Sequence, residues 1–261
     1  MQQDKSEIRL NTPNFIFRND EVKIWQMDLD KLSHKLPYFY TILSADEKER
    51  AARYHFELGQ RRFIIGRGVL RTILSRLINE YPAKIKFIYN EFGKPSLDKS
   101  EHPECDIKFN LAHSDSFMIA AFSKKREIGI DCELIREEYS DLNIAKRFFS
   151  ESEFEELTTL PFEMRSKAFF NCWTRKEAFI KATGKGISAG LNSFGVTVHP
   201  DKPAKLTFVN GSPEEVNKWY LSDIKVSDGL SATFAVEKDD KQLDYDNYSF
   251  IQSDDQLVRG K

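Results

Sequence analysis

The chain has 261 residues, of which 40 % are hydrophobic and 31 % are charged, a composition typical of a folded soluble protein and not of a disordered chain. Its 39 basic and 41 acidic side chains give a formal net charge of -2, without the basic excess that a dedicated nucleic-acid binder usually carries. No apolar run approaches the ~20 residues that a membrane-spanning helix requires, so we expect neither a nucleic acid nor a membrane as partner.

The first half of the chain predicts helices that are followed by strands. Alternating apolar and polar residues indicate strands, and apolar residues three or four apart indicate helices. Ser44 and Glu47 have the spacing of a capping box at the start of a helix. The predicted elements are, in chain order, a strand over 21–29, helices over 44–56 and 57–81, and strands over 85–89, 107–111, 117–123 and 128–133. We expect the strands between 85 and 133 to form one antiparallel sheet.

The second half repeats this order. It predicts helices over 143–149, 152–159 and 161–183, and then strands over 193–198, 205–208, 219–223 and 230–236. Because helices followed by strands occur twice, we predict an α+β fold built from two related α+β halves. The expected division is a flexible leader at 1–20, an N-terminal half at 21–127, a C-terminal half at 128–240 and a solvated, charged tail at 241–261.

The three cysteines, Cys105, Cys132 and Cys172, are widely spaced and form no Cys-x-x-Cys pair. Their odd number does not indicate a disulfide framework, and their spacing does not indicate a zinc site. The polar N-terminal residues 1–10 lack the apolar core of a secretion signal. Reduced thiols in a cytoplasmic protein are the simplest interpretation.

Two acidic side chains, Asp131 and Glu133, lie in a predicted strand with the sequence Gly-Ile-Asp-Cys-Glu. Alternation places both carboxylates on one face of the strand, with Ile130 and Cys132 on the other. Carboxylates at this spacing repel each other in the absence of a cation, and magnesium prefers a few carboxylates together with waters and phosphate oxygens. A solvated strand edge is the commoner explanation of such a pair taken alone.

The predicted helix over 161–183 carries a stripe of mixed character. Phe169, Trp173, Glu177 and Lys181 follow one another at intervals of four residues. The stripe begins apolar and ends polar, which indicates a helix that runs from a core into a polar site. The alternative for Glu177 and Lys181 is an ordinary ion pair on the helix surface.

Further basic residues precede these motifs. Basic side chains are concentrated between Lys48 and Arg71, and Arg62 begins the amphipathic run of the second helix, where an arginine can meet a phosphate. Lys94 lies in a turn that Pro95 stiffens, and His113 follows a predicted strand and could donate to a phosphate. Taken singly, a solvated helix face, a hairpin turn and a structural histidine are the commoner explanations.

The order of these motifs is more informative than any one of them. Gly-Lys-Pro at 93–95, Phe-Asn-Leu-x-His-Ser at 109–114, Gly-Ile-Asp-x-Glu at 129–133 and Trp-Thr-x-Lys-Glu-Ala-x-x-Lys at 173–181 together resemble the 4′-phosphopantetheinyl transferases of the surfactin-synthetase-activating (Sfp) type. The resemblance spans roughly residues 40–236, and Ala-Lys-Arg-Phe-Phe-Ser at 145–150 agrees with it.

The resemblance implies a pseudo-dimer of two similar α+β halves with the active site in the cleft between them. It also implies a magnesium-dependent enzyme that transfers the 4′-phosphopantetheine moiety of coenzyme A to a serine of an apo acyl or peptidyl carrier protein and releases 3′,5′-ADP. Since such a site lies within one chain, we expect a monomer.

The resemblance also assigns roles to single residues. It assigns magnesium to Asp131, Glu133 and Glu177. It assigns contacts with coenzyme A to Arg50, Arg62, Lys94, His113, Asp131, Lys176 and Lys181. It assigns catalysis to Glu177, Lys181 and Glu153, with Glu177 as the first choice and Glu153 as the second choice for the base that removes the serine proton.

The resemblance is not complete, and the residues also allow two other functions. Members often have Ser where this chain has Ala112, so a hydroxyl contact to the ligand is expected to be absent. The stretch Lys146 to Phe149 is the expected docking surface for an acidic carrier. A non-catalytic module that binds coenzyme A or a nucleotide would need no acid triad. A two-metal phosphodiesterase or nuclease is disfavoured by the near-neutral charge.

Overall fold

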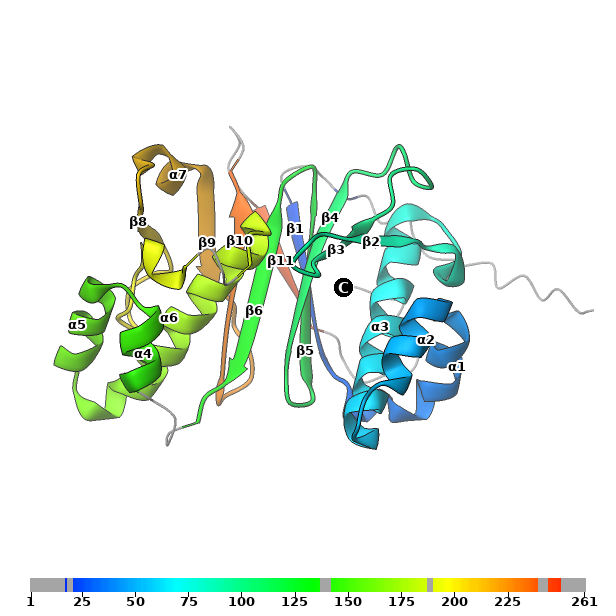
Figure 1. The fold of residues 1–261 in the computed structure, drawn as a ribbon, viewed down its shortest axis with the longest axis horizontal. Helices are drawn as coiled ribbons and strands as arrows, with labels where there is room; N and C mark the ends of the chain where they lie inside the picture. The colour runs from blue at the N-terminus through cyan, green and yellow to red at the C-terminus, as the bar shows by residue number, and fades with distance from the viewer. Residues whose placement is uncertain (1–16, 18–20, 137–141, 187–189, 239–243, 250–261) are drawn as a thin grey trace, which may run out of the picture.

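The computed structural model of the chain describes residues 17, 21–136, 142–186, 190–238 and 244–249. These residues form two groups of elements that follow each other along the chain, joined by the short connection of residues 125–127. In each group a first strand is followed by helices, and the chain then returns as strands (Figure 1).

The first group is a small antiparallel sheet covered by helices. Its elements are, in chain order, β1 (Glu21–Asp28), α1 (Leu36–Ile42), α2 (Ala45–Ala52), α3 (Glu57–Ile78), β2 (Phe87–Tyr89), β3 (Pro95–Leu97), β4 (Ile107–Ser114) and β5 (Phe117–Lys124). The strands β1, β5 and β4 pair antiparallel in that order, and β2 and β3 form a separate hairpin. The predicted capping box at Ser44 and Glu47 is present and starts α2.

The second group has the same plan. Its elements are β6 (Ile128–Leu134), α4 (Leu142–Phe148), α5 (Glu151–Thr159), α6 (Phe162–Thr183), β7 (Phe194–Val196), β8 (Leu206–Val209), α7 (Pro213–Lys218), β9 (Trp219–Asp223) and β10 (Leu230–Glu237). In the order β6-β10-β9, the first strand of the group pairs with its last strand, and the last pairs with the strand before it. The order β1-β5-β4 of the first group follows the same rule. The pair β7–β8 corresponds to β2–β3, and α6 corresponds to α3, with 22 residues in each helix.

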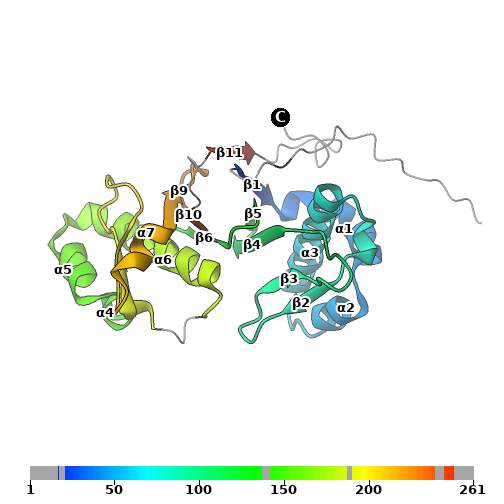
Figure 2. The ribbon, with the colours of Figure 1, turned by 90° about the horizontal axis from the view of Figure 1, so that it is seen from above.

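The two sheets pack against each other in the middle, and the helices cover their outer sides (Figures 1 and 2). The period of two along each strand divides the side chains between these layers. On β6, the even-numbered Ile128, Ile130 and Cys132 enter the core between the sheets. The odd-numbered positions 129, 131 and 133 therefore face α6, and this confirms the predicted shared face of Asp131 and Glu133.

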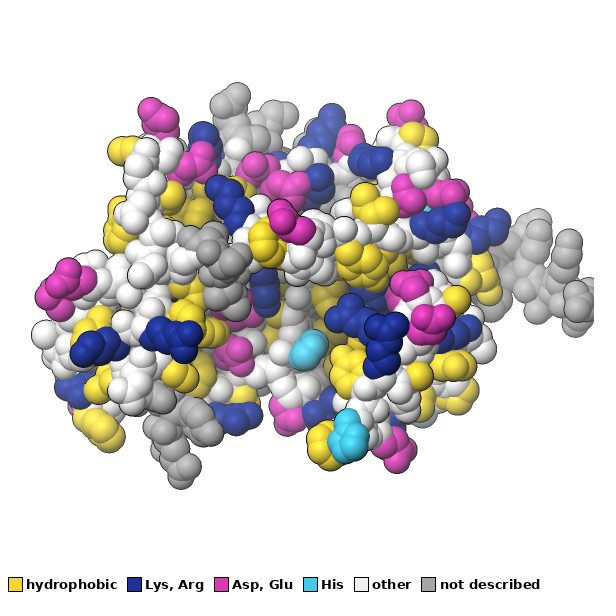
Figure 3. Space-filling model, in the orientation of Figure 1, with side chains coloured by type: hydrophobic (Ala, Val, Ile, Leu, Met, Phe, Trp, Pro, Cys, Tyr) yellow, Lys and Arg dark blue, Asp and Glu magenta, His cyan; other side chains and the backbone are white. Residues whose placement is uncertain are grey.

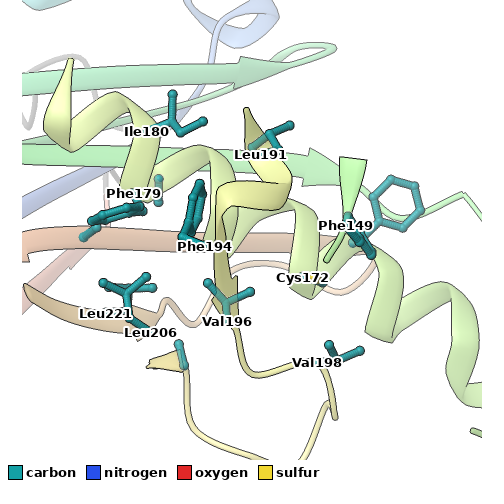
Figure 4. Packing of buried hydrophobic residues seen from close by; sticks show 14 of the residues in the cluster. Phe149, Cys172, Phe179, Ile180, Leu191, Phe194, Val196, Val198, Leu206 and Leu221 are labelled. Atoms are coloured by element: carbon teal, nitrogen blue, oxygen red, sulfur yellow. The ribbon is translucent and has the colours of Figure 1, made fainter. Parts of the chain in front are cut away.

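A dense apolar core fixes α6 on its sheet (Figure 4). Phe179 of α6 meets the ring of Phe194 edge-on, with 4.8 Å between the ring centroids, and Leu221 of β9 lies in the same cluster. Burial of a side chain of this size contributes roughly 1.5–3 kcal/mol. These contacts hold the helix rigidly enough for its polar end to serve as part of a site.

Gly129 lets α6 lie unusually close to β6. A Cβ atom at this position would come within 2.1 Å of the Ala178 carbonyl oxygen and 2.2 Å of the Ala182 amide nitrogen. Both atoms belong to the backbone of α6, so no side-chain rotation can make room. The close approach brings the last two turns of α6 against the strand that carries Asp131.

The seam between the groups is closed by side chains of β4. Asn110 Oδ1 accepts a hydrogen bond from the backbone N–H of Ile130 at 2.9 Å, and Ser114 Oγ accepts one from the N–H of Leu134 at 3.0 Å. Both donors lie on β6, so the two edge strands are held side by side at two separate points.

Two expectations about the strands were wrong. The strands between 85 and 133 form no single sheet, because β2–β3 stands apart and β6 pairs with β10 of the other group. Part of the predicted solvated tail is a strand, since β11 (Asp244–Ser249) pairs parallel with β1. This pairing satisfies backbone groups of β1 that would otherwise lie at an open sheet edge. The predicted leader, apart from Phe17 in the core, lies outside the described residues.

Candidate active site

A cavity of about 730 Å³ opens between the two groups of elements. The first group lines it with α3, the β2–β3 turn and the end of β4, and the second group lines it with the end of α6. Figure 3 shows the surface hollowed between the groups, with Lys and Arg side chains gathered on the side of α2 and α3. Glu177, Lys181 and His113 all reach its wall.

Asp131, Glu177 and Lys181 form the polar centre at the close contact of β6 with α6. Lys181 Nζ donates to Asp131 Oδ1 at 2.6 Å. Asp131 is 4 % exposed and Glu177 is 8 % exposed, so neither carboxylate is a surface group. Glu177 and Lys181 therefore do not form the surface ion pair that was the alternative from the sequence. Lys181 pairs instead with Asp131 on β6.

Glu133 is held by a residue that the sequence did not single out. Ser114 Oγ donates to Glu133 Oε2 at 2.9 Å while it accepts from the amide of Leu134. Ser114 belongs to the Phe-Asn-Leu-x-His-Ser motif, in which the sequence predicted a role for His113 alone. A short hydroxyl residue directly after the histidine, at the end of a strand, was the available signal.

Burial raises the pKa values of all three carboxyl groups. Burial is the largest cause for Asp131, and the Lys181 ammonium lowers the pKa again only in part. For Glu133, the Asp131 charge raises the pKa further, and for Glu177 both other carboxylates do so. Burial opposes the charge on Lys181, but the charge and hydrogen bond of Asp131 together with the charge of Glu177 raise its pKa overall. The three acids therefore lie within one another's field.

Asp131, Glu133 and Glu177 are the candidate ligands of a divalent cation. Within the described residues, no group of three or more His, Cys, Asp and Glu side chains is gathered closely enough to hold a metal ion. The reason is visible in the contacts, since Asp131 turns to Lys181 and Glu133 to Ser114. Yet Asp131 Oδ2 and Glu177 Oε1 are buried and accept no hydrogen bond. Such oxygens are costly unless a donor or a cation satisfies them, so the residues fit a hard cation.

The two arginines that are predicted to contact coenzyme A differ in how far other side chains already occupy them. Arg50 is exposed at the cavity wall, with its guanidinium 5.3 Å from the centre of the Phe63 ring. Arg62 also lines the cavity, but it donates to both carboxylate oxygens of Asp30, at 2.9 and 2.7 Å, and to Asp115 at 2.6 Å. Neither acid was identified from the sequence, and both compete with a phosphate for Arg62.

His113 and Lys94 both line the cavity. The pKa of His113 is lowered, first by desolvation and then by the charge of Lys181, which favours a neutral imidazole. Lys94 Nζ donates to backbone carbonyls and to Glu127 instead of pointing freely into the cavity. Ala112 is buried in the core between the sheets, so the hydroxyl that it lacks would not face the cavity.

Two predicted site residues belong to the core instead. Glu153 is 2 % exposed, and its carboxylate accepts hydrogen bonds from Lys176 Nζ at 2.6 and 2.8 Å and from the amides of Ser150 and Val196. Lys176 is fully buried and also donates to the Phe194 carbonyl. The four hydrogen bonds occupy the acceptor sites of Glu153, and neither residue reaches the cavity wall, so Glu153 as a base and Lys176 as a ligand contact stay predictions. The pair ties α5 and α6 to β7.

Comparison with known proteins gives matches over both groups of elements. The sequence model described as the 4′-phosphopantetheinyl transferase superfamily matches residues 127–235, and one described as the N-terminal part of 4′-phosphopantetheinyl transferase matches 28–125. The 4′-phosphopantetheinyl transferase HetI of Nostoc sp. PCC 7120 is 39 % identical over 86 % of this chain and 91 % of its own length.

Two further relatives are similar over most of their length. The 4′-phosphopantetheinyl transferase psf-1 of Bacillus pumilus is 34 % identical over 77 % of this chain and 86 % of its own. The 4′-phosphopantetheinyl transferase Sfp of Bacillus subtilis is 31 % identical over 73 % of this chain and 80 % of its own. None of the described helices is long and apolar enough to cross a membrane.

Proposed function

Because the chain belongs to the 4′-phosphopantetheinyl transferase superfamily, and is thus an enzyme that transfers phosphopantetheine to carrier proteins, we propose that the transfer takes place in the cavity between its two halves. The halves, 21–127 and 128–240, would form a pseudo-dimer, which the repeated strand order supports. The observation that carries the proposal is the pair of buried, unsatisfied oxygens on Asp131 and Glu177 beside the Lys181 ammonium.

The substrate in this proposal is coenzyme A, with its phosphates between the two walls of the cavity. Arg50 is an exposed cation on the first wall and can take the terminal phosphate. Lys181 and His113 face the pyrophosphate from the inner end, where a neutral imidazole donates one hydrogen bond. Arg62 would join them only after it gives up Asp115 or Asp30, so its contribution is smaller.

Asp131, Glu133 and Glu177 would hold a magnesium ion, whose charge offsets the negative charge of the pyrophosphate and of the departing 3′,5′-ADP. Asp131 accepts a hydrogen bond from Lys181, and Glu133 accepts one from Ser114. Lys181 keeps a positive charge close to the leaving group in either case, because its pKa is raised.

Glu177 has the properties of the base. In the transfer, the serine oxygen of the carrier forms a bond to the phosphorus of phosphopantetheine while the bond from that phosphorus to 3′,5′-ADP breaks. The serine proton goes to the Glu177 carboxylate, whose pKa is raised by burial and by the two neighbouring acids. With Glu153 closed off in the core, Glu177 is the acid of the pair that reaches the cavity.

The carrier would dock on α4. Lys146 and Arg147 are exposed there, and Phe148 is half-buried, with its ring edge-on to Trp173. This mixed surface suits brief contact with an acidic helical domain. Phe149 is not part of it, because its side chain lies in the core. We also propose a monomer in the cytoplasm, in keeping with a site within one chain and three free cysteines.

The proposed site is tested by incubating the protein with coenzyme A, magnesium chloride and an apo carrier, and then measuring the molecular mass of the carrier. The wild type should add one phosphopantetheine to each carrier, and Glu177→Gln should lower kcat by about 10²- to 10⁴-fold, the range of general-base catalysis. Glu163→Gln is the matched control, since Glu163 is exposed in the first turn of the same helix. Equal rates for both variants would exclude Glu177 as the base.

A further inference from the structure

We infer that the turn between β2 and β3 holds the last turn of α6 across the cavity, and that Asn90 and Lys94 are positioning residues for Glu177 and Lys181. Asn90 Nδ2 donates to the Gly184 carbonyl at 3.0 Å. Lys94 Nζ donates to the Ala182 carbonyl at 3.0 Å. Both contacts run from the N-terminal half to the C-terminal half, over 94 and 88 residues of sequence.

The contacted carbonyls are those that a helix leaves unsatisfied. The last four C=O groups of an α-helix have no partner within the helix. α6 ends at Thr183, and Gly184 takes the left-handed cap with φ 68°. Ala182 and Gly184 therefore offer free carbonyls, and the β2–β3 turn supplies a donor to each. The Lys94 charge also lies at the negative end of the helix dipole, where a cation is stabilised.

Lys94 has no hydrogen left for a phosphate. An ammonium group has three donor hydrogens. They meet the carbonyls of Ala182 and Ile128 and the Glu127 carboxylate, at 3.0, 3.2 and 3.3 Å. The side chain is only 17 % exposed, and desolvation lowers its pKa. A ligand would have to displace one of these partners, so the contact of Lys94 with coenzyme A that the resemblance implied is replaced by a contact with the protein itself.

The turn is shaped to make these contacts. Asn90 Oδ1 accepts from the amides of Phe92 and Lys94, at 3.0 and 2.8 Å, and Gly93 takes a φ of 79°. The ring of Phe92 lies so close to Gly186 that a Cβ there would come within 2.5 Å of it. Asn90 thus orders its own turn through Oδ1 and holds the end of α6 through Nδ2.

The held segment carries the reacting groups. Glu177 and Lys181 lie within the last two turns of α6, and Lys181 directly precedes Ala182, whose carbonyl accepts the hydrogen bond from Lys94. A helix end without this support frays, because its terminal hydrogen bonds open easily. Loss of the turn contacts should therefore move Lys181 relative to Asp131 and slow the transfer while leaving the binding of coenzyme A largely intact.

Asn90→Asp is the sharpest test, because it keeps the oxygen that orders the turn and removes the donor to Gly184. It also sets a carboxylate against a carbonyl at the negative end of α6. We expect kcat to fall about tenfold, since small displacements of reacting groups are costly, with KM for coenzyme A changed less than about twofold. Amide exchange of residues 180–186 should become faster. Asn217→Asp, on the exposed face of α7, is the control.

Lys94→Met decides between a positioning residue and a phosphate ligand. The probes are coenzyme A and 3′-dephospho-coenzyme A, whose dissociation constants are measured for the wild type, for Lys94→Met and for Lys86→Met, an exposed control at the start of the same hairpin. We expect kcat to fall about tenfold for Lys94→Met only. The dissociation constant of 3′-dephospho-coenzyme A divided by that of coenzyme A should stay unchanged. Glu127 keeps Lys108 as its partner in this variant.

The inference is overturned if Lys94→Met reduces the ratio toward one, because Lys94 then binds the 3′-phosphate. It is also overturned if Asn90→Asp leaves both kcat and the exchange of 180–186 at wild-type values. The inference rests on the proposed roles of Glu177 and Lys181 only for its effect on kcat. Faster exchange in Asn90→Asp without a change in kcat would locate the failure in those proposed roles and not in the contact between the halves.

Discussion

Gly129→Ala should separate the two elements that carry the site. The added Cβ would lie 2.1 Å from the Ala178 carbonyl oxygen, whereas ordinary van der Waals contact begins at 3.4 Å, so roughly 1.3 Å of retreat is needed. The obstacle is helix backbone, which cannot yield locally without breaking its own hydrogen bonds. The retreat must therefore be taken up by α6 as a body, against the core around Phe179.

The size of the effect follows from that displacement. The 2.6 Å contact between Lys181 and Asp131 would lengthen to at most about 3.9 Å, beyond hydrogen-bond distance. Overpacking of this kind costs about 1–3 kcal/mol, which corresponds to a loss of roughly 3–9 °C in Tm for a chain of this size. A displacement near 1 Å at a reacting centre can cost about 10² in rate, so kcat should fall by that order.

Thermal unfolding and the carrier-mass assay measure these two losses separately. Gly59→Ala is the stability control, because its Cβ meets only the movable ring of Tyr54, at 3.0 Å, and alanine is favoured inside a helix. Its Tm should stay level or rise. If Gly129→Ala keeps both the Tm and the kcat of the wild type, the close approach of α6 to β6 does not organise the site.

Two further changes test the buried charges. Glu153→Gln leaves the Lys176 ammonium buried beside a neutral partner, and we expect about 3–5 kcal/mol less free energy of unfolding in a urea titration; a loss within 0.5 kcal/mol, the scatter of surface substitutions, would contradict the role of the pair. Glu177→Gln should raise the Tm of the metal-free protein at pH 8. Because the folded-state pKa of Glu177 is raised, the folded wild type binds the proton more tightly than the unfolded chain and loses stability as the pH rises from the ordinary glutamate range through that pKa. The advantage of the variant should therefore shrink on acidification, and an equal Tm difference at pH 8 and pH 4, measured with a chelator, would contradict the raised pKa.

Local patterns in the sequence were sufficient for most elements of the fold. The capping box at Ser44, the long helices and the alternation along β6 are all set by neighbours within a few residues. The partner of β6 was not predictable in this way, because the choice between β5 and β10 depends on how residues 125–127 turn the chain from one sheet to the other. The strand β11 was missed because its charged flanks outweighed its short strand pattern.

The candidate site shows the same limit. Alternation correctly put Asp131 and Glu133 on one face, but it could not show that Lys181 pairs with Asp131 or that Ser114 holds Glu133. The resemblance assigned site roles to Lys176 and Glu153, but it could not show that the two side chains form a buried pair away from the cavity wall. The burial of a charged pair and the saturation of its hydrogen bonds are properties of the packed structure.

The repeated plan of the two halves has a consequence for how such a site can evolve. In a symmetric homodimer every substitution appears once in each subunit, so a surface cannot change without its symmetry-related copy changing too. Here residues 125–127 join the two copies of the plan in one polypeptide, and the walls are free to diverge. The wall on the side of α3 presents arginines and the wall on the side of α6 presents Glu177. Two separately encoded halves can thus divide the roles of cation and acid between them, and each can change without the other.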